Sequence, residues 1–154
     1  MVTGAFLWDI EGIFTEIYFM FDETQGYKHN DHFFCSSTVA LAEVCNAPDK
    51  DGVFVVYELK GGRITLVYIG RSVVNNLRSA ILHSYQFGLP RKKSWPLKML
   101  TENIDALDVY WWVTNDLEHS ESPEKLHRLL IRHHLIMYGE LPRWNQEDMK
   151  KKSK

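Results

Sequence analysis

A phenol and a guanidinium stand ten residues apart in the middle of this chain, at Tyr68 and Arg78. Tyr68 ends a run of alternating β-type residues, and Arg78 belongs to the helical pattern that follows. A strand followed by a helix can bring both side chains to one small surface. There a phenol can share a proton and a guanidinium can hold a phosphate. The pair therefore predicts an interaction with phosphodiesters, and so with nucleic acid.

A β-hairpin is expected to position Tyr68. Residues 53–57 and 64–69 are rich in β-branched and aromatic residues, and Gly61-Gly62 separates them. Two registers suit a tight turn: one pairs Phe54 with Tyr68, and the other pairs Tyr57 with Tyr68. The sequence leaves both open. The choice matters because only Tyr57 carries a hydroxyl group.

Helices and one further strand are predicted after the hairpin. Ser72 is expected to cap a helix that reaches residues 83–85. A basic aromatic loop, residues 91–95, comes next. The remaining predicted elements are a short helix or turn over residues 98–104, a strand over residues 106–113, and a helix that begins at Ser122-Pro123-Glu124 and ends at Gly139. The order β-β-α-α-β-α predicts an α+β fold.

The first 50 residues differ from the rest in charge. Residues 1–51 contain two lysines and nine acidic residues, whereas residues 52–154 contain 16 basic and 11 acidic residues. A hairpin over residues 5–21 and a short helix from Ser36 or Ser37 to Cys45 are expected in this acidic part. We predict an N-terminal appendage of residues 1–50, a domain of residues 51–146 and a basic tail of residues 147–154. The acidic appendage could contact a protein partner, and the basic domain favours polyanions.

The totals are those of one folded domain. The chain has 154 residues, of which 45% are hydrophobic, and no apolar run approaches the length of about 20 residues that a membrane helix needs. Its first residues lack the basic stretch of a secretory signal. Cys35 and Cys45 are too few for a disulfide framework and are expected to be buried. We therefore expect a soluble, cytoplasmic protein.

Four short strings together resemble the GIY-YIG nuclease family over roughly residues 52–146. They are Gly52-Val53-Phe54, Tyr68-Ile69-Gly70-Arg71-Ser72, Arg78 in the next helix, and Pro142-Arg143-Trp144-Asn145. The resemblance implies a small mixed β-sheet flanked by helices. It also implies an endonuclease that hydrolyses DNA phosphodiester bonds with Mg²⁺ or another divalent metal.

Roles for individual residues follow from that resemblance. The implied catalytic residues are Tyr68, Arg78, Tyr57 and His83. The candidate metal ligands are His127 and Glu124. The candidate nucleic-acid contacts are Arg71 and Asn145 in the motif strings and, from the charge of the basic aromatic loop, Lys92 and Lys93.

Two positions depart from the family pattern. Phe54 stands where the pattern has its first tyrosine, and it cannot take part in proton transfer. His127 stands in the middle of the last helix where the family has a metal-binding glutamate, and Mg²⁺ prefers oxygen ligands. Three hypotheses result: a metal-dependent endonuclease, a catalytically silent domain that binds nucleic acid, and a protein-interaction module.

Overall fold

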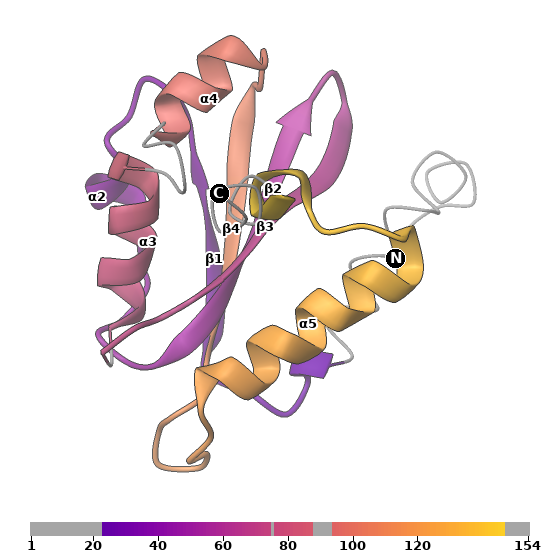
Figure 1. Cartoon of the computed structure of the whole chain (residues 1–154). Helices are drawn as coiled ribbons and strands as arrows, with labels where there is room; N and C mark the ends of the chain where they lie inside the picture. Colours follow the sequence, from indigo (N-terminus) through magenta and orange to yellow (C-terminus); the bar gives the residue numbers. More distant parts are fainter. Residues whose placement is uncertain (1–22, 75, 88–93, 147–154) are drawn as a thin grey trace, which may run out of the picture.

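A four-stranded antiparallel sheet forms the centre of the fold (Figure 1). The computed structural model describes residues 23–74, 76–87 and 94–146. The order of the strands across the sheet is β1-β4-β2-β3, and each of these pairings is antiparallel. The strands are β1 (Asn30–Cys35), β2 (Gly52–Lys60), β3 (Arg63–Arg71) and β4 (Ala106–Val113). The α+β class is therefore confirmed, and the sheet of the described residues is antiparallel where we expected a mixed one.

Helices cover both faces of the sheet. On one face lie α2 (Leu41–Val44), α3 (Leu77–Phe87) and α4 (Trp95–Thr101), and on the other lies α5 (Pro123–Tyr138) (Figure 1). The core is correspondingly divided into two clusters. Leu77 and Trp95 belong to the cluster on the α3 side, and Leu126 and Leu130 belong to the cluster on the α5 side. A side chain on β2 or β3 therefore faces one of two separate layers.

The β2–β3 hairpin is confirmed, but neither predicted register is. Gly61 and Gly62 both have positive φ angles, 56° and 77°, which two-residue hairpin turns require. Tyr68 pairs with Val56, and the next pair is Tyr57 with Leu66. Val67 is therefore the extra residue of a β-bulge. The bulge places Tyr57 and Tyr68 on opposite faces, since Tyr57 packs in the α5-side cluster and Tyr68 against the α3-side cluster.

Strand β1 was not predicted, and it lies in the stretch that we assigned to the N-terminal appendage. It pairs along its length with β4 at one edge of the sheet. Phe33, Cys35 and Leu41 belong to the α3-side core cluster. Residues 30–45 are thus built into the same core as the strands that follow. The hairpin predicted at residues 5–21 and the tail at residues 147–154 lie outside the described residues.

The ends of the helices agree with the sequence signals in α5 but not in α3. The Ser122 hydroxyl accepts a hydrogen bond from the Glu124 amide, and Gly139 closes α5 with a φ of 75°. By contrast, α3 begins at Leu77, because the Ser72 hydroxyl accepts from the Gly52 amide and donates to Asp51 instead of capping a helix. Among the described residues, no helix has the length and apolar composition needed to cross a bilayer.

The buried aromatic residues and thiols are as expected. Trp111, Trp112 and Trp144 are each at most 3% exposed. Cys35 and Cys45 are buried free cysteines, and burial raises the pKa of the Cys35 thiol to about 11. Trp95, predicted to lie in a loop, is instead the first residue of α4 and is buried.

Candidate nucleic-acid interface

The two motif strings meet on the α3 side of the sheet. Phe54 pairs with Gly70 across the hairpin, and the rings of Phe54 and Tyr68 lie 5.9 Å apart. A Cβ atom on Gly70 would lie within 2.8 Å of ring atoms of both residues. The glycine therefore allows the two rings to pack over the strand. Phe54 is 1% exposed, so the residue at the family's first tyrosine position is part of the core.

Tyr57 cannot supply the missing phenol beside Tyr68. Its side chain is 1% exposed on the other face of the sheet, where its ring meets that of Tyr110 edge to face at 5.6 Å. The β-bulge at Val67 is the cause, because it fixes which residues of the hairpin share a face. The structure therefore does not bring Tyr57 and Tyr68 together.

Arg78 has a partner that the sequence did not indicate. Its guanidinium donates to the backbone oxygens of Cys45 and Ala42, at 2.5 and 3.1 Å. Both carbonyl groups lie at the end of the short helix α2, where oxygens lack partners within the helix and a cation is favourable. Arg78 thus joins α3 to α2. His83 lies farther along α3 and is exposed.

Asn145 and His127 both bind the backbone of Ile69 on edge strand β3. The amide of Asn145 accepts from the Ile69 N–H at 2.9 Å and donates to the Ile69 carbonyl at 3.0 Å. His127 Nε2 lies 3.1 Å from the same carbonyl oxygen. Because a carbonyl can only accept, this ring nitrogen carries the proton. Asn145 therefore completes the hydrogen bonding of the edge strand, a structural role where we predicted a nucleic-acid contact.

Arg71 and Glu124 lie together at the junction of β3 and α5. The Arg71 guanidinium is 3.5 Å from the Glu124 carboxylate, and the two side chains are 35% and 57% exposed. An ion pair this exposed contributes little to stability. Arg71 consequently stays accessible to an anionic ligand at the N-terminal end of α5.

The predicted metal ligands do not fit a magnesium ion. His127 uses Nε2 as a donor to Ile69, and Glu124 pairs with Arg71. Mg²⁺ requires several oxygen ligands in near-octahedral geometry. Within residues 23–146, apart from the two undescribed gaps, no cluster of three or more His, Cys, Asp or Glu side chains could hold a metal ion. We derive no reaction step that passes through a metal.

A row of cations on α5 is the main feature that sequence reasoning did not single out. Lys125, Arg128 and Arg132 are exposed and lie three and four residues apart, which places them on one side of the helix. They line an open groove of about 530 Å³ together with His127, Ile131 and Leu135. Helical spacing within the predicted helix could have revealed this basic stripe, by which we mean Lys125, Arg128 and Arg132. Lys92 and Lys93, our first choice for phosphate contacts, lie outside the described residues.

Comparison with known proteins adds no relative. No protein-family model matches the chain, and no curated protein and no solved structure is significantly similar to it. The resemblance to GIY-YIG nucleases therefore depends on the motif residues and their order alone.

Proposed function

We propose that this chain is a nucleic-acid-binding domain of GIY-YIG type that has lost phosphodiester hydrolysis. The proposal is carried by one contrast between two sets of residues. Arg78 and Asn145, at positions implied to act on the substrate, bind the protein's own backbone. The cations of the basic stripe, by contrast, are exposed to solvent. The retained polar residues thus maintain the fold, and the exposed cations bind the ligand.

The basic stripe suits a phosphate backbone in its spacing. A helix rises about 1.5 Å per residue, so the seven residue steps from Lys125 to Arg132 span about 10 Å. One strand of DNA rises about 3.4 Å along the duplex axis per phosphate, and because the strand also winds around that axis, the stripe can reach about two neighbouring phosphates. Arg71 lies near the N-terminal end of α5, where it forms an exposed ion pair with Glu124. Contacts of this kind bind DNA without reading its sequence.

Loss of hydrolysis follows from the side chains at the motif positions. Phe54 cannot exchange a proton with an attacking water molecule, and Tyr57 lies on the other face of the sheet. The guanidinium of Arg78 would have to leave two carbonyl oxygens to stabilise a phosphate in the transition state. Proton transfer and charge stabilisation by protein side chains are therefore both impaired.

Binding is tested by fluorescence anisotropy with a labelled DNA duplex over a range of salt concentrations. The variant Arg128→Ala/Arg132→Ala should bind more weakly. The slope of its plot of log affinity against log salt should decrease in magnitude by about 2, since each phosphate contact contributes about 0.9 to that slope. The matched control is Lys60→Ala/Arg63→Ala, which removes the same charge at the exposed end of the hairpin. Equal losses in both variants would show that only net charge matters and would reject the basic stripe as the binding surface.

Hydrolysis is tested with supercoiled plasmid in Mg²⁺, Mn²⁺ or chelator. We expect no nicking above the background of a mock preparation, while the same protein still binds the plasmid. Metal-dependent nicking that is abolished in Arg78→Ala would refute the loss of hydrolysis and restore the endonuclease hypothesis. Absence of both nicking and binding would refute the proposed function as a whole.

A further inference from the structure

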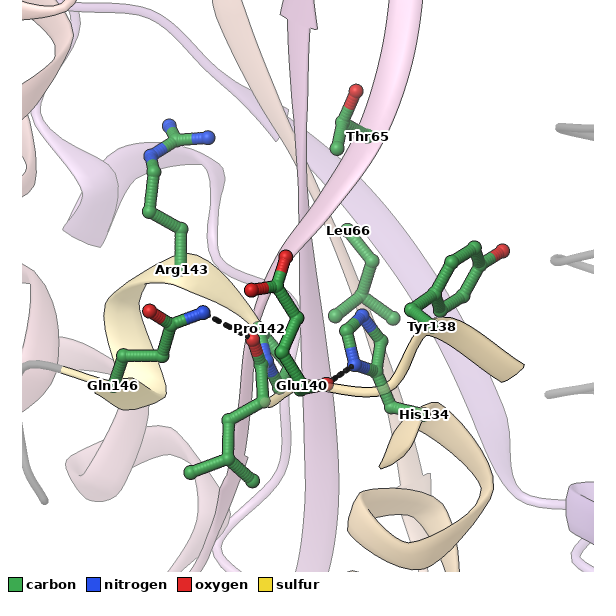
Figure 2. Close-up of a pocket in the computed structure, with 9 residues that line it drawn as sticks. Thr65, Leu66, His134, Tyr138, Glu140, Pro142, Arg143 and Gln146 are labelled. Carbon is green, nitrogen blue, oxygen red and sulfur yellow. Dashed lines mark hydrogen bonds between the residues drawn. The ribbon is translucent and has the colours of Figure 1, made fainter. Parts of the chain in front are cut away.

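A second pocket lies between the start of β3 and the segment that follows α5, and the proposed function does not use it. Its volume is about 390 Å³, and Leu66, His134, Tyr138, Glu140 and Arg143 are among the residues that line it (Figure 2). The basic stripe contributes no residue to this lining. The pocket is therefore a separate candidate site.

His134 presents a hydrogen-bond acceptor at this pocket. His134 is only 6% exposed, and its Nδ1 lies 2.6 Å from the Glu140 carbonyl oxygen. Nδ1 must carry a proton to make this bond. Burial lowers the pKa of the imidazole, which favours the neutral ring. Nε2 then holds a lone pair, and among the described residues it has no hydrogen-bond partner.

The charges around the pocket favour a cation. Arg143 is held by two carboxylates, with a distance of 2.8 Å to Glu58 and 2.5 Å to Glu102. Glu140 adds a third carboxylate on an exposed side chain. Glu58 and Glu102 do not line the pocket, so they neutralise Arg143 and leave Glu140 as the pocket's own carboxylate, beside the neutral His134. The Glu140 carboxylate would repel a phosphate and attract a positively charged group.

We propose that this pocket binds a guanidinium group, with His134 Nε2 and the Glu140 carboxylate accepting its N–H groups. A planar guanidinium offers five donors in a fixed arrangement, so it can serve both acceptors at once. An ammonium ion offers three donors from a single point and matches two separated acceptors less well. Tyr138, whose ring lies 4.8 Å from that of His134, adds an aromatic wall against which a guanidinium can pack. The source is either a free guanidinium compound or an arginine side chain of a protein partner.

Titration of ¹⁵N-labelled protein with methylguanidinium and with the peptide Gly-Arg-Gly tests this site. Both probes should shift the His134 ring resonances, and Gly-Lys-Gly and Gly-citrulline-Gly should bind about tenfold more weakly or not at all. Tighter binding of Gly-Arg-Gly than of methylguanidinium would identify a protein side chain as the ligand. The reverse order would identify a free compound. Equal binding of the citrulline peptide, or no shift with either guanidinium probe, would overturn the proposal.

Two variants make the test independent of folding. Glu140→Gln changes an exposed side chain and should weaken binding of Gly-Arg-Gly by about tenfold, whereas the control Glu118→Gln, also exposed, should not. Burial lowers the pKa of His134, so binding should also weaken as the pH falls below that lowered pKa, where His134 takes up a proton and loses its acceptor. Unchanged binding in Glu140→Gln would refute the site. DNA binding should be unaffected by this variant, so the result is separate from the proposed function.

Discussion

Replacing Asn145 by alanine should destabilise the protein without directly weakening its contact with DNA. The Asn145 amide makes two hydrogen bonds to Ile69, at 2.9 and 3.0 Å, and the residue is 8% exposed. After the substitution the Ile69 carbonyl keeps its contact with His127 at 3.1 Å. The Ile69 N–H loses its partner. The two backbone groups of Ile69 are therefore affected unequally.

The magnitude follows from that inequality. An unpaired buried N–H costs about 1–3 kcal/mol, and loss of the bond to a carbonyl that keeps another donor costs about 0.5–1 kcal/mol. Together these give a loss of about 1.5–4 kcal/mol in the free energy of unfolding. For a domain of this size the loss corresponds to a decrease of roughly 1–2 M in the urea midpoint. Asn145→Asp should be at least as destabilising, because a carboxylate would face the Ile69 carbonyl oxygen.

Urea unfolding, monitored by tryptophan fluorescence, measures this effect. The neighbouring Gln146→Ala serves as the control, because it removes only one bond, to the Leu141 carbonyl, and should cost less than about 1 kcal/mol. An unchanged midpoint in Asn145→Ala, combined with weaker DNA binding, would refute the structural role. That result would indicate that Asn145 contacts the nucleic acid directly.

Three further perturbations test other parts of the structure. Gly70→Ala should destabilise by about 1–3 kcal/mol, because its Cβ would overlap the Phe54 ring, and Phe54→Leu should recover part of the loss in a double-mutant cycle in urea. Arg78→Ala should lower the thermal midpoint of unfolding through loss of its bonds to α2, and an unchanged midpoint would contradict that role. The pKa of His134 is lowered in the folded protein, so its stabilising contribution is complete above its ordinary pKa of 6.5 and is lost as the pH falls. His134→Gln should flatten the pH dependence of the urea midpoint in that range, and an unchanged slope would show that another group titrates.

Elements with local signals could be predicted from the sequence. The β2–β3 hairpin was predicted because Gly61-Gly62 fixes its turn, and α5 because Ser122-Pro123 and Gly139 mark its ends. Strand β4 was found at its observed limits because residues 106–113 alternate in polarity. In each case the determining residues lie within or beside the element itself.

Features that depend on distant residues could not be predicted. Strand β1 begins with the polar residues Asn30-Asp31-His32, and its partner β4 is far away in the sequence. The β-bulge at Val67 leaves no sequence signal, yet it decides that Tyr57 and Tyr68 face different layers. The partners of Arg78 lie on α2, 33 and 36 residues away, so spacing within α3 could not reveal them.

The order of the strands in the sheet has a consequence for how the chain folds. The β2–β3 hairpin can form as soon as both strands exist, but β1 and β2 each need β4 beside them. The bond from Asn145 to Ile69 spans 76 residues, so the opposite edge is completed only after Asn145 has been synthesised. Contacts this distant slow folding, because a long loop must close before they form. On the ribosome, the emerging chain should carry an isolated hairpin until β4 has left the exit tunnel, and the sheet should then close in one late step.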